Sequence, residues 1–392
     1  MCVVLCFIVH LKKMNDKITE KFNKLAGRND ILVLGIESSC DETAAAVVRG
    51  RRVLSDVVAS QTDIHTLYGG VVPEIASRSH AVAFTGVVDR ALREANVTLN
   101  DIEAIAVTSR PGLIGSLLVG VCTAKALAFA KDIPLIDINH IEAHICANYV
   151  MGMGGDGGGD NNGDNTRRTE GVAPCNSPLP TPHSPLLAPP FLSLVASGGH
   201  TSIIDVTGYN EYKTIGRTTD DAIGEAFDKV ARLLGLPYPG GPNVDKLAQS
   251  GDPYAIDFIK TRGKKGYSLS YSGLKTAVAN YVNQRRQKGE EYNTADVCAS
   301  FTRQAVDMLL DAVFAAAEEY GRDTIAVAGG VAANSYLRRA LAERAEAKGR
   351  RIVIPPINLC TDNAVMVALR GFFAAREGVG LADLSLNVES VV

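Results

Sequence analysis

Short apolar runs, each closed by small polar residues, recur at two widely separated places along the chain. Residues 31–37 form one such run, and a polar turn at 38–43 leads into a second run at 44–48. The same sequence of features returns at residues 191–196, 197–201 and 202–206. Short apolar runs bounded by turn residues are typical of buried strands, so each set predicts a β-hairpin.

A strand, a glycine-containing loop and a helix follow each hairpin. In the first half these are residues 104–108, 109–112 and 114–130, and in the second half 324–328, 329–334 and 336–348. Two copies of the same order predict two similar α/β lobes that face each other. One continuous doubly wound sheet is the alternative, but it would not explain why the hairpin recurs.

A glycine-, aspartate- and proline-rich segment separates the two halves. It lacks apolar residues to bury and its prolines oppose regular hydrogen bonding, so it predicts a flexible surface insertion. The predicted organisation is therefore an N-terminal extension at 1–30, a first lobe at 31–150, the insertion at 151–190 and a second lobe at 191–392.

Composition and charge place the chain in the cytoplasm and away from membranes. The eight cysteines contain no C-x-x-C pair, which favours a reducing compartment. Residues 2–9 are apolar but too short to cross a bilayer, and we expect residues 1–13 to be an extension upstream of a start at Met14. The net charge of −3 means that any nucleic-acid site must be a local basic patch or be shared with a partner.

Three glycine-rich turns predict a phosphate-binding cleft between the lobes. Residues 197–199 and 329–330 follow strands, and residues 235–242 follow a predicted helix at 223–234. Backbone N–H groups at such turns and at helix starts suit phosphate oxygens. There is no Walker A motif, and the only G-x-G-x-x-G, at 152–157, lies in the insertion and not between a predicted strand and helix, which argues against a P-loop enzyme or a typical dinucleotide oxidoreductase.

Four carboxylates have candidate roles around this cleft. Asp41 and Glu42 lie in the first hairpin turn, where they would face phosphates or an associated cation. Asp228, on a predicted helix, and Asp245, after the proline-glycine loop, could accept hydrogen bonds from a ribose. Surface carboxylates and helix caps are the alternative for each of them.

His140 and His144 stand one helical turn apart, on one face of a predicted helix. This spacing suits two ligands of one metal ion, although a solvated helix face would show it too. A zinc protease of the H-E-x-x-H type is excluded, because Glu142 is rotated by about 200° from His140 along the helix. Asp362, at a predicted helix start, is the candidate third ligand.

Nine ordered motifs together resemble the TsaD family of tRNA threonylcarbamoyladenosine transferases, over roughly residues 31–375. They are GIESSCDET (35–43), GGVVPEIASR (69–78), HIEAH (140–144), SGGHT (197–201), DDAIGEAFDK (220–229), YPGGP (238–242), SGLKTA (272–277), GGVAAN (329–334) and CTDN (360–363). His200 is similar to the bacterial and organellar branch. The insertion and the N-terminal extension are not part of the family pattern.

The resemblance implies the actin-like ATPase (ASKHA) fold, with two duplicated α/β lobes around a nucleotide cleft. It implies a divalent metal, iron with zinc as the alternative, on His140, His144 and Asp362. We expect Asp41 and Glu42 to have supporting catalytic roles. It also implies that an adenine nucleotide or threonylcarbamoyl-AMP is bound by Val195, Ala196, Ser197, Gly198, Gly199, Asp228, Gly241, Asp245 and Asn334.

The implied reaction moves a threonylcarbamoyl group from threonylcarbamoyl-AMP to N6 of the adenosine beside the anticodon, in tRNAs that read codons beginning with A. The implied partners are tRNA, a TsaB-like paralogue that pairs with the first lobe, a TsaE-like ATPase and a TsaC-like synthase that supplies the donor. The candidate tRNA-facing residues are Lys260, Arg262, Lys264, Lys265, Arg285 and Arg286, with a solvated basic surface as the alternative.

Three other functions compete with this prediction. A small-molecule kinase of the same fold would not need His140 or His144. A non-catalytic paralogue would have lost the metal ligands, which are all present. A secreted endopeptidase, the older label of the family, is disfavoured by the place of Glu142 and by the lack of a secretion signal.

Overall fold

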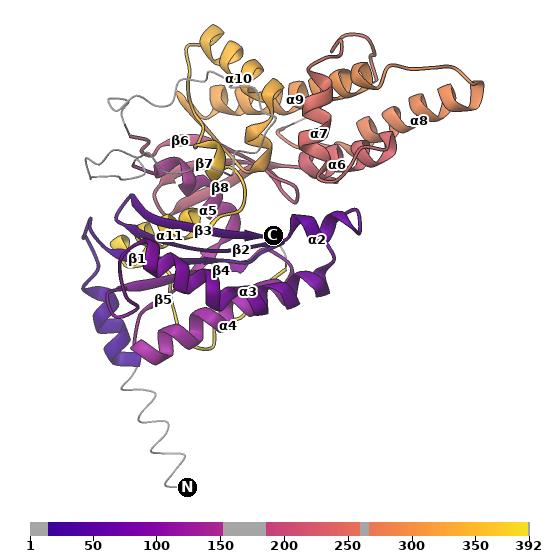
Figure 1. The fold of residues 1–392 in the computed structure, drawn as a ribbon. Coiled ribbons are helices and arrows are strands. Elements are labelled where there is room, and N and C mark those ends of the chain that lie inside the picture. Colours follow the sequence, from indigo (N-terminus) through magenta and orange to yellow (C-terminus); the bar gives the residue numbers. More distant parts are fainter. Residues whose placement is uncertain (1–14, 152–185, 259–265, 391–392) are drawn as a thin grey trace, which may run out of the picture.

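Two β-sheets form the centres of two α/β lobes (Figure 1). The computed structural model describes residues 15–151, 186–258 and 266–390. The first sheet has the strand order β11 (Leu381–Ala382), β5 (Leu135–Asn139), β4 (Ala104–Arg110), β1 (Leu32–Glu37), β2 (Glu42–Arg49) and β3 (Arg52–Ser60). The second has the order β10 (Arg351–Val353), β9 (Thr324–Ala328), β6 (Phe191–Ala196), β7 (Thr201–Gly208) and β8 (Glu211–Arg217).

The two sheets repeat one topology. β1, β2 and β3 form an antiparallel meander, and β4 and then β5 add to β1 in parallel. β6, β7 and β8 form the same meander, and β9 and then β10 add to β6 in parallel. The duplicated fold predicted from the recurring hairpins is therefore confirmed.

Each predicted hairpin has a third strand that the apolar pattern did not reveal. β3 alternates between buried and exposed positions, and β8 is largely exposed. Both lie at sheet edges, so they need no continuous apolar run. Strands β1 and β6, which are buried along their whole length, are the ones that the sequence shows clearly.

Helices cover the sheets in layers (Figure 1). In the first lobe α3 (Pro73–Glu94) and α4 (Ile114–Lys131) cover the outer face, and the short α2 (Thr62–Thr66) precedes α3. The second lobe carries α6 (Ile223–Leu234), α7 (Gly240–Ala248), α8 (Ser272–Lys288), α9 (Thr294–Glu319) and α10 (Ser335–Ala347). Between the sheets lie α5 (His140–Cys146) and α11 (Ala364–Glu377), in one core shared by both lobes.

The end of the chain returns to the first sheet. α11 packs on β1, β2 and β4, and β11 pairs with β5. Gly35 makes the close approach of α11 possible, because a Cβ there would lie 2.4 Å from the carbonyl oxygen of Ala364. At the other end residues 15–23 are helical, and Phe22 is buried in the shared core. The residue ranges assigned to the lobes stay predictions, and most of the 151–190 insertion lies outside the described residues.

Candidate active site

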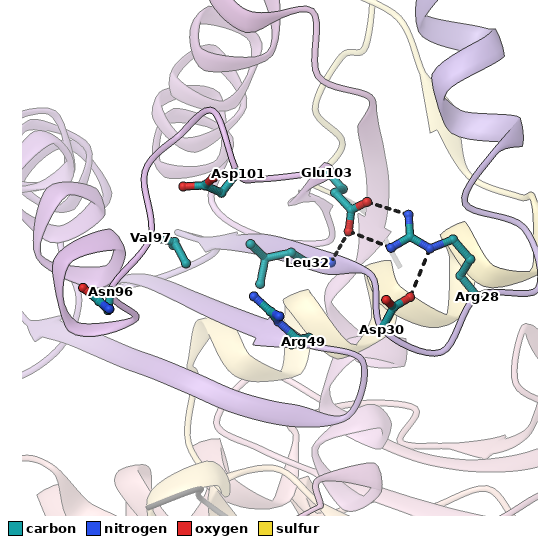
Figure 2. A pocket seen from close by; sticks show the side chains of 8 residues that line it. All are labelled: Arg28, Asp30, Leu32, Arg49, Asn96, Val97, Asp101 and Glu103. Atoms are coloured by element: carbon teal, nitrogen blue, oxygen red, sulfur yellow. Dashed lines mark hydrogen bonds and ion pairs between the residues drawn. The ribbon is translucent and has the colours of Figure 1, made fainter. Parts of the chain in front are cut away.

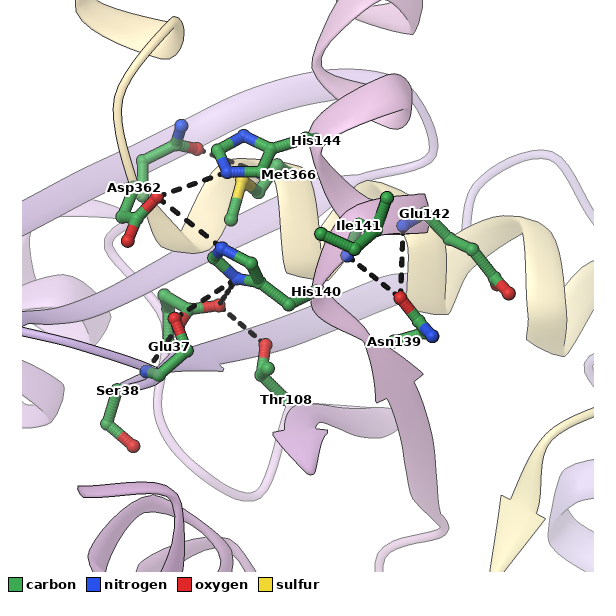
Figure 3. Close-up of polar contacts among 12 residues, drawn as sticks. Glu37, Ser38, Thr108, Asn139, His140, Ile141, Glu142, His144, Asp362 and Met366 are labelled. Carbon is green, nitrogen blue, oxygen red and sulfur yellow. Dashed lines mark hydrogen bonds and ion pairs between the residues drawn. The ribbon is translucent and has the colours of Figure 1, made fainter. Parts of the chain in front are cut away.

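His140, His144 and Asp362 converge at the junction of the two lobes (Figure 3). Strand β5 leads directly into α5, whose start is capped by the side chain of Asn139. Asp362 immediately precedes Asn363, the cap of α11, so a helix start fixes it too. The Asp362 Oδ1 atom lies 3.6 Å from His140 Nε2 and 3.1 Å from His144 Nε2.

The donor set fits a metal ion. Both ring nitrogens of His144 are buried and have no hydrogen-bond partner among the described residues, although Nε2 is close to Asp362. One ligand atom from each of the three residues falls within a 4.8 Å span. Zinc–nitrogen and zinc–oxygen bonds of about 2.0–2.2 Å place ligand atoms at such separations. The three residues could therefore hold a divalent cation, as the sequence predicts.

Glu142 turns away from this cluster, as the helical rotation predicts. Its Oε2 atom accepts a hydrogen bond of 2.9 Å from Nε of Arg370 on α11. This ion pair joins α5, which carries both histidines, to α11, which begins just after Asp362. Glu142 therefore cannot be the general base of a zinc protease.

Mutual charge dominates the protonation of the cluster. Burial opposes the imidazolium of His140, but the charges of Glu37 and Asp362 and the hydrogen bond that Nδ1 of His140 donates to Glu37 raise its pKa to about 9. Burial likewise opposes the Asp362 carboxylate, and the histidines nevertheless hold its pKa well below the usual value. The neighbouring His200, whose ring centroid is 6.2 Å from that of His140, has its pKa lowered to about 4, mainly by burial.

Glu37 was given no role by the sequence, yet it is fully buried beside His140. Its carboxylate accepts hydrogen bonds from the backbone N–H of Ser39 and from the hydroxyl of Thr108, each at 2.6 Å. The same carboxylate lies 3.2 Å from Nδ1 of His140. A charged residue that ends an apolar strand is the only signal in the sequence that could have indicated this position.

The glycine turn at residues 197–199 lies between two close backbone contacts in the second lobe. A Cβ at Gly224 would meet Ser197 O at 2.5 Å, and one at Gly329, where φ is +89°, would meet Ala196 O at 2.3 Å. By contrast, Gly198 and Gly199 have open space around them. The turn therefore offers backbone to a ligand, whereas the side chains of Val195 and Ala196 are buried in β6.

The glycine turns reach the metal cluster through Gly330. A Cβ built at this glycine would lie 3.8 Å from the methyl group of Thr361, the residue before Asp362. Gly330 also begins a short 3₁₀ turn, Gly330–Ala333, that leads into α10. The 329–330 turn is therefore a neighbour of the segment that carries Asp362, and a single ligand site that joins the phosphate turns and the metal ligands stays a prediction.

Asp228 and Asp245 both cap helices. Asp228 caps α7, and Asp245, which lies on α7, caps α10. Asp228 Oδ1 accepts from the N–H groups of Gly240 and Gly241, at 2.8 and 3.2 Å. Asp245 Oδ1 accepts from Asn334 Nδ2 at 3.0 Å and from the hydroxyl of Ser335 at 2.8 Å. Asp228 is thus paired with Gly241, and Asp245 with Asn334. Ligand binding by these residues stays a prediction.

Asp41 and Glu42 lie in the first lobe, where β2 begins. Glu42 accepts a hydrogen bond of 2.8 Å from Ser60, while its Oε2 atom is buried without a partner among the described residues. Burial raises the pKa of Glu42 to about 8. Burial and then the charge of Asp41 raise the pKa of Tyr238 in the second lobe.

A separate cavity of about 420 Å³ lies at the other end of β1 (Figure 2). It is lined by Arg28, Asp30, Leu32, Arg49, Asn96, Val97, Asp101 and Glu103. Arg28 pairs there with Glu103 at 2.5 Å and with Asp30 at 3.0 Å, so these charged groups satisfy one another in ion pairs. Since Leu32 and Glu37 stand about 17 Å apart along the strand, this cavity is not part of the candidate active site.

Comparison with known proteins supports one family. Residues 52–155 and 176–369 match the family model described as TsaD, tRNA N6-adenosine threonylcarbamoyltransferase. The tRNA N6-adenosine threonylcarbamoyltransferase of Clostridium botulinum (strain Kyoto / Type A2) is 46% identical over 93% of this chain and 97% of the relative. That of Clostridium novyi (strain NT) is 48% identical over 91% of this chain and 96% of the relative.

Solved structures of HypF share the fold. Full-length HypF in a phosphate- and nucleotide-bound form has a TM-score of 0.57 and 13% sequence identity, over 90% of this chain. The HypF of T. kodakarensis has a TM-score of 0.57 and 14% identity, over 92% of this chain. The present chain spans about half the length of those two proteins, 47% and 49%.

Proposed function

The chain belongs to the TsaD family and is a tRNA N6-adenosine threonylcarbamoyltransferase that forms t6A, and we propose that its cleft binds threonylcarbamoyl-AMP beside a divalent metal on His140, His144 and Asp362. The observation that supports this most directly is the convergence of these ligands next to the open glycine turn. HypF, which shares the fold, is described as phosphate- and nucleotide-bound. The small-molecule kinase alternative has no comparable support.

In the proposed reaction N6 of the adenosine attacks the carbamoyl carbon of the donor. A C–N bond forms, the C–O bond to the phosphate of AMP breaks, AMP leaves and N6 loses a proton. A bound divalent ion, iron in our proposal and zinc as the alternative, would supply Lewis-acid stabilisation of developing negative charge. The chain itself contributes mainly orientation, because the exocyclic amine is a weak nucleophile.

The nucleotide part of the donor is assigned to the second lobe. The backbone N–H groups of Ser197, Gly198 and Gly199 would bind the phosphate, since no side chain obstructs them. The main chain of Val195 and Ala196 would line the floor of this site, and Gly241 its rim. Asp228, Asp245 and Asn334 would bind the ribose or base, because Asp228 contacts the start of α7, and Asp245 and Asn334 meet at the start of α10.

The donor assignment can be tested with purified protein, its partners and tRNA. Prepared threonylcarbamoyl-AMP, added without a synthase, threonine or bicarbonate, should give t6A and AMP in equal amounts. Nucleoside mass spectrometry measures both products. If t6A forms only when a synthase and its substrates are present, the proposed donor is wrong; a phosphorylated small molecule would instead indicate a kinase.

We propose Glu42 as the group that accepts the amine proton, and Asp41 as the neighbour that orients phosphate or an associated cation. Because the pKa of Glu42 is about 8, the carboxylate form becomes dominant only above that pH. The transfer rate should therefore rise about tenfold per pH unit up to pH 8 and then level off. Glu42→Gln should be slow and lack this rise, as initial rates from pH 6 to 9 would show.

The free energy of unfolding should also depend on pH through Glu42. It should fall as the pH rises, over the range in which the transfer rate increases. Folding raises the pKa of Glu42 above its ordinary value of 4.5, so its favourable contribution is complete below pH 4.5 and is lost as the pH rises through about 8. Thermal unfolding of wild type and Glu42→Gln should diverge across this range. The assignment would be contradicted if Glu42→Gln had the same pH profile of rate as wild type and the same pH profile of stability.

The outer helices of the first lobe carry a surface that suits a protein partner. Ile114, Leu118 and Phe129 follow one face of α4 at helical spacing, with exposed fractions of 46%, 47% and 56%. Val82 on the adjacent α3 is 85% exposed. α4 is apolar and long enough to cross a membrane, but its other face packs on β4. We propose that a TsaB-like paralogue covers this stripe with its own helices.

The stripe predicts a clear effect of one charged substitution. Leu118→Glu should abolish association with a TsaB-like partner, because a carboxylate would be buried against apolar side chains. The thermal unfolding temperature of the isolated chain should change little, since Leu118 is half exposed. Size-exclusion chromatography with the partner measures association, and Asp89→Ala on α3 is an exposed control. Undiminished association of Leu118→Glu would place the partner elsewhere.

The substrate tRNA and the remaining partners complete the proposal. Of the basic residues predicted to face tRNA, Lys260, Arg262, Lys264 and Lys265 lie outside the described residues. Arg285 and Arg286 end α8, where Arg285 pairs with Glu290 and Arg286 with the carbonyl of Leu233. We propose that this end of the second lobe contacts tRNA phosphates. A TsaE-like ATPase and a TsaC-like synthase act with the chain in this proposal, and the reaction takes place in the cytoplasm.

A further inference from the structure

Glu37 occupies an unusual position for a carboxylate, because its side chain is fully buried at the end of β1. Its hydrogen-bond partners come from three separate segments: Ser39 in the first turn, and Thr108 on β4 and His140 on α5, which Figure 3 shows. Removing a carboxylate from water costs several kcal/mol unless other groups compensate it. Such a group is retained where it serves a neighbour, and here the neighbour is a candidate metal ligand.

The donors around Glu37 determine how His140 is protonated when it holds a metal. The backbone N–H of Ser39 and the hydroxyl of Thr108 both donate to the carboxylate, which is an acceptor-only group. Nδ1 of His140 faces one of the same oxygens at 3.2 Å, and it must carry a hydrogen to be attracted there. The lone pair of the neutral ring is then on Nε2, the atom that faces Asp362.

The two imidazoles differ in this respect. Nδ1 of His140 also lies 3.2 Å from the hydroxyl of Ser39, so two side chains hold its ring. Nδ1 of His144 has no hydrogen-bond partner among the residues that the structure describes. His140 is therefore the ligand whose orientation is built in, and Glu37 is the group that sets it.

We propose, on the basis of the metal site proposed above, that Glu37 is a positioning residue which fixes the ring and tautomer of His140 so that Nε2 receives the ion. Carboxylates that bind the outer nitrogen of a ligating histidine typically change metal affinity by about 10–100-fold. Glutamine has the size of glutamate but brings an amide N–H₂ group among donors. Glu37→Gln should therefore lose metal affinity without loss of the fold.

The test is titration of the metal-free full chain with Co²⁺, followed by its visible absorption spectrum. Wild type should bind one ion, and Glu37→Gln should bind about 10–100-fold more weakly, with a shifted spectrum. Ser193→Ala, at a buried position of β6, the counterpart of β1, should match wild type. Imidazole ¹⁵N spectra of the Zn²⁺ form should show His140 protonated at Nδ1 in wild type, and this signal should change in Glu37→Gln.

The outcomes separate this inference from the metal site itself. If wild type binds Co²⁺ and Glu37→Gln binds it equally well with the same spectrum, the role of Glu37 is overturned while the ligands stand. If wild type binds neither Co²⁺ nor Zn²⁺, the proposed metal site fails first. If Glu37→Gln does not fold, Thr108→Val is the variant that decides. It keeps the charge of Glu37 but removes one hydrogen-bond donor to its carboxylate. Unchanged Co²⁺ affinity and spectrum in Thr108→Val would then overturn the proposal.

Discussion

Asp362→Asn should reduce t6A formation by at least about 100-fold, and the purified variant should contain little metal. Asparagine preserves the size of the side chain but removes the negative charge that faces both His140 and His144. Without this carboxylate, two neutral imidazoles remain as protein ligands, too few for a typical catalytic site. Metal content by elemental analysis and initial rates of transfer at saturating tRNA measure the two effects.

An exposed carboxylate provides the control for this substitution. Asp323 has a fully exposed side chain, and its charged neighbour Arg350 is 3.9 Å away. Asp323→Asn should therefore keep wild-type metal content and rate. If Asp362→Asn kept both as well, Asp362 would not be a ligand, and the convergence of the three residues would have only a structural meaning.

Local patterns predicted the elements whose apolar residues are continuous or follow a helical period, and failed where burial depends on distant parts of the chain. Strands β1 and β6 and helix α6 were predicted within a residue or two, because their apolar residues mark them directly. The return of α11 to the first sheet was not predicted. Its apolar sequence would suit either lobe, and the contact depends on the lack of a side chain at Gly35.

The candidate site shows the same limit. The spacing of His140 and His144 predicts that both lie on one face of a helix, and the structure confirms it. Asp362 comes from more than 200 residues away, so its choice needed the family pattern as well as its place before a helix. Glu37 could not be assigned a role, because the sequence of a strand does not show which of its ends lies beside a metal-binding residue from another segment, here His140.

The hydrogen bonds by which Asp245 on α7 holds the start of α10 lead to the second prediction with a large expected effect. Asp245 accepts hydrogen bonds from Asn334 and from Ser335, so it fixes the start of α10 at the edge of the cleft. In Asp245→Ala these donors lose their acceptor, and partly buried unsatisfied donors cost about 1–3 kcal/mol each. Asn334 would then turn away to find water, and the donor substrate would lose a contact.

Asp245→Ala should therefore raise the KM for threonylcarbamoyl-AMP by about 10–100-fold, with a smaller change in kcat, because binding rather than bond making is affected. Steady-state rates with varied donor and saturating tRNA measure the split. Asp257→Ala is the control, since that carboxylate is 67% exposed and 3.9 Å from Arg303. An unchanged KM would mean that Asp245 only caps a helix. A fall in kcat alone would instead place Asp245 near the reacting carbonyl, on the side of the cleft that faces the metal ligands.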